Sequence, residues 1–374
     1  MKKSLIALAV LSTIAGSVAA QSSVTVYGRF DQGYNNVELK NADGTSTKAK
    51  NTGLDGGVGG SRLGFKGTED LGGGLKANFV FELGADMGED VGAAKTRLGF
   101  AEIASPSVGT ARIGRQVSPV KAVLDGFRPS GNNTNFRPGD FYYGGTRDLS
   151  DDTKDTTGYL NADQRVSNAI TYITPTIAGF SAQYQIAEVT NNSGTGTNTA
   201  SISTATTKAA LNSADGQAQA AGGSLNYAAG KFAAAYATFG MKTKAAGVTT
   251  VDESVDTFAA SYDLGVAKLH ALYSQQEIKA SGTKVRDADL TTVGVTAPVG
   301  KWALSAEYSD GSAKAIANGD DGQDVDGYKI RAMYNLSKRT GIYAQMGESK
   351  YKSKVAGEGT TKVEGYNIGV AHTF

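Results

Sequence analysis

The chain contains no cysteine, which excludes disulfides, thiol chemistry and cysteine-based metal sites. After the first 20 residues, no apolar run reaches the roughly 20 residues that a membrane-spanning helix needs. The chain also has no excess of either sign of charge. Without Lys2 and Lys3, the 37 basic residues become 35 against 36 acidic ones, a balance of −1. This near-neutral balance argues against a nucleic-acid partner.

The first 20 residues have the features of a secretory signal peptide. A basic start is followed by the apolar run Leu5–Ile14 and by small residues that end at Ala20. A membrane anchor is the alternative, but this run is far shorter than a spanning helix. We therefore expect residues 1–20 to be removed and residues 21–374 to form one exported domain.

The rest of the chain is dominated by alternation of large apolar residues with small or polar ones. At the C-terminus, Tyr366, Ile368 and Val370 alternate with small or polar residues as far as Phe374. The second face of such segments is too polar for a dry core, so a lipid-facing exterior around an aqueous lumen is the simplest arrangement. Sixteen segments are expected to be strands: 23–33, 60–69, 75–86, 94–103, 109–115, 165–173, 179–187, 220–228, 231–240, 256–263, 266–278, 288–297, 301–309, 324–335, 340–349 and 363–374.

The links between these segments alternate in length. Short turns follow the even-numbered strands, and Pro106, Pro175 and Pro298 lie in them, where no ladder hydrogen bond is needed. Short turns on one rim and long loops on the other are typical of outer-membrane barrels. The sequence therefore predicts an all-β fold, a 16-stranded antiparallel transmembrane β-barrel with both termini on the periplasmic rim. The long polar links are 34–59, 116–164, 188–219, 241–255, 310–323 and 350–362.

The link 116–164, which follows the fifth predicted strand, is too long for a passive hairpin. It carries three prolines and several aromatic residues, so we expect it to fold into the lumen and narrow the pore. Asp125 and Asp140 then become candidate acids of the constriction. The alternative is that these aspartates cap turns in an external loop.

Basic residues recur on the predicted inner face of the early strands. Arg29, Arg62, Lys66, Arg97 and Arg165 all point inward in this alternation. Guanidinium groups stay charged in water, and a row of them along a narrow passage favours anions. The alternative for any one arginine is that it is solvated or paired with a loop acid. The same alternation points the following side chains toward lipid: Leu98, Phe100, Glu102 and Val166.

Several segments together resemble a known family. Ser61–Lys76 resembles the second hairpin of general Gram-negative porins, especially betaproteobacterial ones, and Ser22–Gly28 resembles their mature start. Ile113–Gln116 resembles the strand before their inward-folded third loop, and Tyr172–Pro175 with Gly179–Phe180 resembles their next hairpin. The terminal Phe374 is typical of the family. The resemblance covers essentially the whole mature chain and is specific in combination.

The resemblance implies a homotrimer of 16-stranded barrels in the outer membrane, in contact with its lipid and lipopolysaccharide. It implies passive diffusion of small hydrophilic solutes and inorganic ions, without a cofactor. Arg62, Arg97 and Arg165 match the constriction arginines that face the third loop, and Phe374 matches the terminal signal read by the barrel-assembly machinery. The family usually has a small residue near Glu102, so a bulge or a neighbouring subunit is expected there.

Three other functions compete with this prediction. A barrel enzyme needs a positioned base, but His270 and His372 have no nucleophile or metal motif nearby. An adhesin needs long loops but no charged interior. A substrate-specific channel often adds a plug domain, for which strand 23–33 leaves no room after the signal. We therefore predict an anion-preferring general-diffusion porin and not an enzyme.

Overall fold

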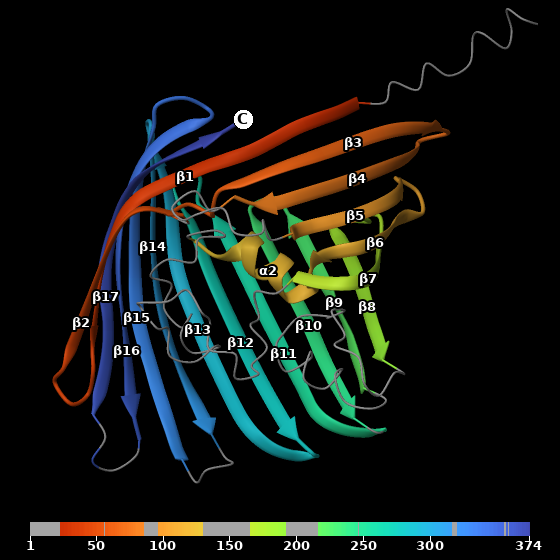
Figure 1. Ribbon diagram of the computed structural model, residues 1–374. Coiled ribbons are helices and arrows are strands. Elements are labelled where there is room, and N and C mark those ends of the chain that lie inside the picture. Colours follow the sequence, from red (N-terminus) through yellow and green to blue (C-terminus); the bar gives the residue numbers. More distant parts are fainter. Residues whose placement is uncertain are drawn as a thin grey trace, which may run out of the picture.

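The computed structural model describes residues 23–55, 57–85, 96–129, 165–191, 216–245, 247–315, 320–354, 357 and 359–374. The expected signal peptide, residues 1–20, and Asp140 lie outside these ranges. The described residues form 17 strands and one helix (Figure 1). Their bounds are β1 Ser23–Lys40, β2 Ser46–Asp55, β3 Arg62–Gly72, β4 Leu75–Gly84, β5 Thr96–Ser105, β6 Gly109–Val117, α2 Pro119–Phe127, β7 Arg165–Ile173, β8 Phe180–Asn191, β9 Gly216–Ala229, β10 Phe232–Ala245, β11 Val248–Asp263, β12 Lys268–Ala280, β13 Thr283–Val299, β14 Trp302–Ala315, β15 Asp320–Asn335, β16 Thr340–Ser353 and β17 Thr360–Thr373.

The strands form one antiparallel sheet that closes on itself. β1 pairs with β17 on one side and with both β2 and β3 on the other. β3 pairs with the first part of β1, Ser23–Arg29, and β2 pairs with the last part, Gln32–Lys40. β2 and β3 therefore share one position in the wall, and the 17 strands occupy 16 positions. The predicted 16-stranded antiparallel barrel is confirmed.

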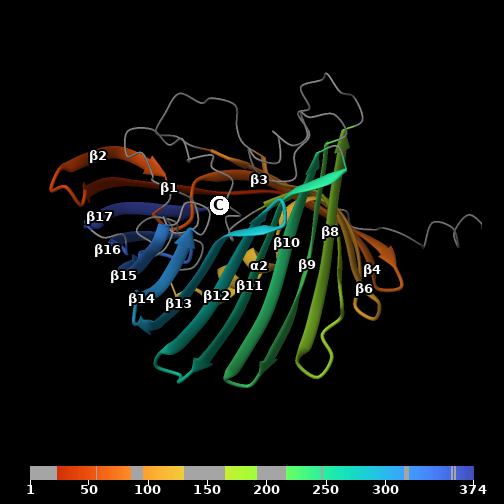
Figure 2. The same ribbon diagram turned by 90° about the horizontal axis from the view of Figure 1, so that it is seen from below.

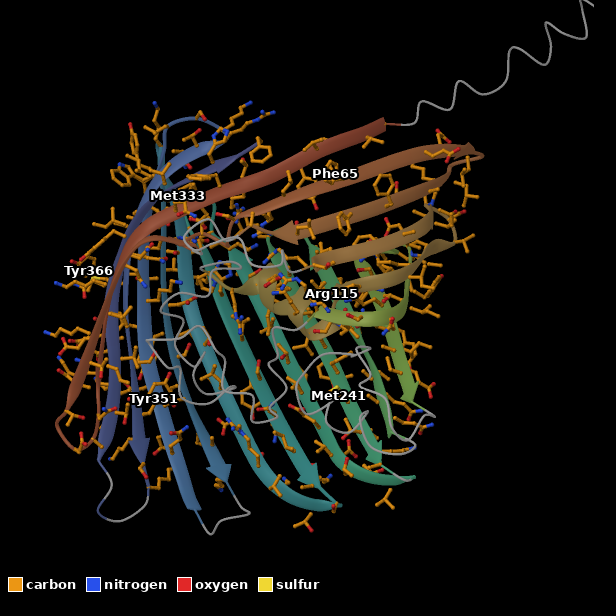
Figure 3. All side chains as sticks on the ribbon, viewed as in Figure 1. Phe65, Arg115, Met241, Met333, Tyr351 and Tyr366 are labelled. Atoms are coloured by element: carbon orange, nitrogen blue, oxygen red, sulfur yellow. The ribbon has the colours of Figure 1, made fainter. Side chains whose placement is uncertain are left out.

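The two faces of the wall differ as the alternation predicts. On β14, Trp302 and Tyr308 are 45% and 46% exposed, whereas Glu307 is 5% exposed. On β17, Tyr366 is exposed and Asn367 is fully buried, and Figure 3 shows Tyr366 on the outside of the barrel. A membrane protein exposes large apolar side chains because hydrocarbon is its solvent. The apolar face is therefore the outer face, and the polar face lines the interior.

The wall has a low side and a tall side. Strands β3 to β7 contain 9 to 11 residues each, whereas strands β9 to β17 contain 13 to 17. Figure 1 shows the short strands crossing one side and the long strands rising on the other. About 9 to 11 tilted residues are enough to cross the hydrocarbon layer. The tall side therefore extends well beyond the membrane.

The helix α2 begins the long link that follows β6. Ser118 caps it by accepting a hydrogen bond from the Lys121 backbone N–H at 3.1 Å, and Pro119 occupies the first helical position. Val120, Val123 and Leu124 are buried in one cluster with inner-wall residues of β7 to β12. Figure 2 shows α2 inside the ring of strands. In the described ranges, no helix is both long and apolar enough to cross a membrane.

A bulge in β5 corrects three of the predicted orientations. Glu82 on β4 pairs with Leu98 and Leu83 pairs with Thr96, which leaves Arg97 as an extra residue. A bulge reverses the faces of the residues that follow it. Leu98, Phe100 and Glu102 therefore face the lumen, and the prediction that they face lipid is wrong.

Contacts of Glu102 support this correction. Its carboxylate accepts hydrogen bonds from Asn78 at 3.1 Å and from the Nε of Arg112 at 2.7 Å. The Arg112 guanidinium also lies over the Phe100 ring, 4.3 Å from its centroid. A bulge was one of the two features expected near Glu102, the other being a neighbouring subunit.

A second bulge shifts the start of β7. The register with β6 changes between Gly114 and Gln116, and Asn168 takes a left-handed φ of 55°. Val166 is fully buried in the cluster around α2, so it faces inward. The prediction that Val166 faces lipid is therefore wrong, because an alternation pattern cannot register an inserted residue.

Candidate pore constriction

Arg29, Arg62 and Arg97 lie on the inner face of the low wall, and the charge of Arg165 reaches Arg62 from the start of β7. Arg29 on β1 pairs directly with Arg62 on β3 in the strand register. The charged groups that act most strongly on Arg62 include Arg97 of β5, Arg165 at the start of β7, and Arg29. Three of the predicted arginines therefore act on the charge of the fourth, Arg62, although the four come from four strands.

Glu82 joins two of these arginines. Its carboxylate accepts a hydrogen bond from the Nε of Arg97 at 2.7 Å and lies 3.7 Å from an Nη of Arg62. The Tyr27 hydroxyl donates to its other oxygen at 3.1 Å. The sequence prediction missed Glu82. Alternation with Phe81 on segment 75–86 is the signal that places Glu82 on the inner face.

Glu82 offsets part of the arginine charge, so its removal is expected to increase the preference for anions. In the Glu82→Gln variant the amide oxygen can still accept from Arg97, so the position of this guanidinium is kept while one negative charge is lost. We expect the anion-to-cation permeability ratio to rise roughly twofold, because one nearby charge is removed from the pathway. The measurement is the reversal potential in a KCl gradient, and an unchanged or lower ratio would contradict the role given to Glu82.

Lys66 belongs to the same wall but not to this cluster of contacts. It lies on β3 and faces inward with Arg62, because residues 62, 64 and 66 share one face of the strand. Its Nζ lies 5.4 Å from the centre of the Tyr27 ring. Lys66 therefore adds positive charge along the wall, on the periplasmic side of Arg62.

Asp125 lies on α2 and forms an ion pair within the helix. Its carboxylate is 3.1 Å from the Nζ of Lys121, one turn earlier. Because the Lys121 charge is so close, Asp125 contributes little net negative charge to the lumen. Its role as a constriction acid stays a prediction, and Asp140 lies outside the described residues.

His270 fastens the end of α2 to the wall. Its Nδ1 lies 2.7 Å from the Phe127 carbonyl oxygen, and its Nε2 lies 3.1 Å from the Thr296 hydroxyl. Both ring nitrogens are thus used in structural contacts. Among the described residues, no group of three His, Cys, Asp or Glu side chains could hold a metal ion.

The inner basic surface extends to β15. Arg331 faces inward from this strand, and the charges of Glu307, Asp31 and Arg29 act on it. Alternation with Ile330 on segment 324–335 is the signal that places Arg331 on the inner face, but Arg331 was not among the predicted site residues. Arg331 is far from Arg29 in sequence, and only the closure of the barrel brings the two residues near each other.

Phe374 completes the barrel beside this cluster. Its backbone N–H donates to Gly28 at 3.2 Å, and the Gly28 N–H donates to the Phe374 carbonyl at 3.1 Å. The last residue therefore pairs with the first strand next to Arg29. This contact is structural, and the role of Phe374 as an assembly signal stays a prediction.

A closed barrel with an apolar exterior and a charged lumen is the architecture of a membrane channel. A family model described as Gram-negative porin matches residues 7–354 of the chain. The chain belongs to the Gram-negative porin family. Over the full length of both sequences, this porin is 32% identical to outer membrane porin protein 32 of Delftia acidovorans. It is 28% identical to the major outer membrane protein P.IB of Neisseria lactamica, again over both full lengths.

A solved structure has the same fold. It is described as an anion-selective porin from Comamonas acidovorans, and it shares 28% identity with this porin at a TM-score of 0.69. The match covers 94% of this chain and 100% of that chain. These relatives and the barrel place the porin in the outer membrane.

Proposed function

We propose that the barrel is a water-filled general-diffusion channel that prefers anions and carries small hydrophilic solutes and inorganic ions. One observation carries this proposal. The charges of Arg97, Arg29 and Arg165 act on Arg62, and Glu82 is the carboxylate that binds Arg97 and lies beside Arg62. Positive charge therefore predominates where a permeating ion passes this wall.

The physical argument is electrostatic. A guanidinium remains charged throughout the physiological pH range, so the cluster is a permanent positive source. Low-dielectric walls focus its field into the passage, which lowers the barrier for an anion and raises it for a cation. Asp125 does not offset this field strongly, because Lys121 neutralises it locally. The likeness to an anion-selective porin supports the same sign of selectivity.

The proposed role is a passive conduit, with no catalytic step. The histidine in the lumen, His270, is committed to the Phe127 carbonyl and the Thr296 hydroxyl, so we assign it to holding α2 in place. No contact in the described part of the chain favours an enzyme or an adhesin over a channel. The channel is therefore the function that we carry forward.

Further parts of the proposal rest on the sequence and on the family resemblance. We propose that residues 1–20 are a cleaved signal peptide and that the porin assembles as a homotrimer. Contacts with outer-membrane lipid and lipopolysaccharide, and recognition of Phe374 by the barrel-assembly machinery, belong to the same proposal. Lys66 is proposed to support the arginines, and Asp140 to contribute negative charge from the third loop.

Planar-bilayer recording of the purified porin tests the proposal. We expect stable stepwise currents and a reversal potential in a KCl gradient with the sign of anion preference. An absence of channels would contradict the conduit, whereas a cation-preferring current would contradict only the assignment of the arginines.

A further inference from the structure

Asp31 is a fully buried carboxylate on β1, beside the break between β2 and β3. One of its oxygens accepts hydrogen bonds from three successive backbone N–H groups, those of Val58, Gly59 and Gly60, at 2.7, 2.9 and 3.2 Å. Successive N–H groups that converge on one anion form a nest, which is a strong and geometrically specific arrangement. Asp31 therefore fixes the backbone of segment 57–61.

Ser61 adds two more contacts to the same segment. Its hydroxyl accepts from the Asp31 backbone N–H at 3.0 Å and donates to the Asp31 carbonyl oxygen at 3.2 Å. Residues 58–61 are thus held against β1. Their place in the wall is set by Asp31 and not by strand pairing, because the described pairing of β1 passes from β3 to β2 at this point.

Tyr343 contacts Asp31 from β16, which is separated from β1 by β17. Its hydroxyl donates to the second Asp31 oxygen at 3.0 Å, from β16, and the side chain is 2% exposed. Glycines make the room for this ring. A Cβ at Gly57 or Gly369 would overlap Tyr343, and one at Gly33 would touch its hydroxyl. β1, β17 and the segment before β3 are therefore all shaped around this ring.

The segment in turn holds Arg62. The Nε of Arg62 donates to the Gly60 carbonyl oxygen at 3.2 Å, and an Nη donates to that of Gly59. The same two residues thus present their N–H groups to Asp31 and their carbonyl oxygens to Arg62. We propose that Asp31 and Tyr343 are positioning residues that fix the Arg62 guanidinium in the pore, an inference that rests on the proposed function.

The physical reason is the length of the arginine side chain. An arginine side chain has many rotamers, so its charge spreads over many positions unless several groups hold it. Glu82 lies 3.7 Å from one side of the guanidinium, and the Gly59 and Gly60 carbonyls hold the other. A fixed charge at the narrow part of a passage selects ions better than one that can fold back along the wall.

The positioning role of Asp31 and its negative charge predict opposite changes in selectivity, so one variant can distinguish them. If Asp31 acts only as a negative charge near the lumen, the Asp31→Asn variant should show a stronger anion preference. If Asp31 positions Arg62, the same variant should show a weaker one. Tyr343→Phe changes no charge and keeps the ring among the glycines, so it is the cleaner variant and guards against misfolding of the first.

The experiment is a double-mutant cycle on the purified porin, read as the reversal potential in a KCl gradient. Tyr343→Phe and Asp31→Asn are each made in the wild type and in Arg62→Gln. In the wild type, we expect the anion-to-cation permeability ratio to fall about twofold, or about 0.4 kcal/mol in relative barriers. In the Arg62→Gln background, we expect no further change from Tyr343→Phe, because the charge being positioned is gone, and no further fall from Asp31→Asn.

The outcomes separate this inference from the proposed function. If Arg62→Gln alone leaves the ratio unchanged, the proposed role of Arg62 is wrong and this inference is overturned with it. If Arg62→Gln lowers the ratio but Tyr343→Phe does not, only the positioning role is overturned. Equal effects of Tyr343→Phe in both backgrounds would also overturn it, since that result would show a general distortion of the wall.

Discussion

Replacing Arg62, Arg97 and Arg165 together by glutamine is expected to abolish the anion preference of the channel. The three charges act on the same short stretch of the pathway, and Glu82 would then remain there without its two partners. We expect the anion-to-cation permeability ratio to fall roughly tenfold, because only Arg29 and Glu82 then remain of the cluster and their charges cancel. The reversal potential in a KCl gradient should move toward cations.

A charge-conserving variant is the matched control. Arg62→Lys, Arg97→Lys and Arg165→Lys together keep three positive charges while removing the guanidinium fork. This control should retain the anion preference, and Arg339→Gln, which removes an exposed charge from a short turn, should leave it unchanged. Unchanged selectivity in the triple glutamine variant would refute the role of the arginine cluster.

Gly28→Ala is expected to destabilise the closed barrel strongly. A Cβ at Gly28 would come 2.5 Å from the Arg62 carbonyl oxygen and would also overlap the Phe374 ring. The backbone of the neighbouring strand cannot move aside without breaking its ladder. We expect a loss of about 1–3 kcal/mol in the free energy of unfolding, as for other overpacked sites. The measurement is the urea midpoint of the porin in detergent.

Gly99→Ala is the matched control for this prediction. It also adds one methyl group to a glycine in a strand of the low wall, but there its closest contacts are ordinary, at 3.7 and 4.0 Å. We expect its urea midpoint to lie close to that of the wild type. If Gly28→Ala and Gly99→Ala have the same midpoint, the close approach of Phe374 and Arg62 to Gly28 does not matter for stability.

Most of the fold could be predicted from the sequence because the membrane imposes a simple pattern. Each barrel strand needs one face for lipid and one for the lumen, so alternation marks the segments that cross the membrane. All 16 predicted segments have a counterpart in the wall. The polar extensions were not predicted. β2, Ser46–Asp55, lies in a predicted loop, and β11 begins at Val248, before the predicted segment 256–263.

The orientation of individual side chains could be predicted only between bulges. Arg29 and Arg62 were placed correctly, because β1 and β3 pair without a shift over this stretch. Phe100 and Val166 were misplaced, because one inserted residue in each strand reverses the faces. Bulges depend on backbone pairing between neighbours, and this pairing leaves no trace in the alternation of a single strand.

The contacts within the constriction depend on barrel closure, which no local pattern contains. The sequence brought out the arginines by their number on neighbouring strands, but it did not show that Glu82 binds two of them. It also did not show that Asp31 and Tyr343, 312 residues apart, would meet. Such pairs form because the last strands return to the first.

The reversal potential of the purified wild-type porin in a KCl gradient tests the central claim most directly. A lumen wall with four clustered arginines predicts single channels whose zero-current voltage lies toward the chloride equilibrium potential. A zero-current voltage of zero, or one displaced toward the potassium equilibrium potential, would contradict the account. The cluster would then not favour anions among the ions that pass.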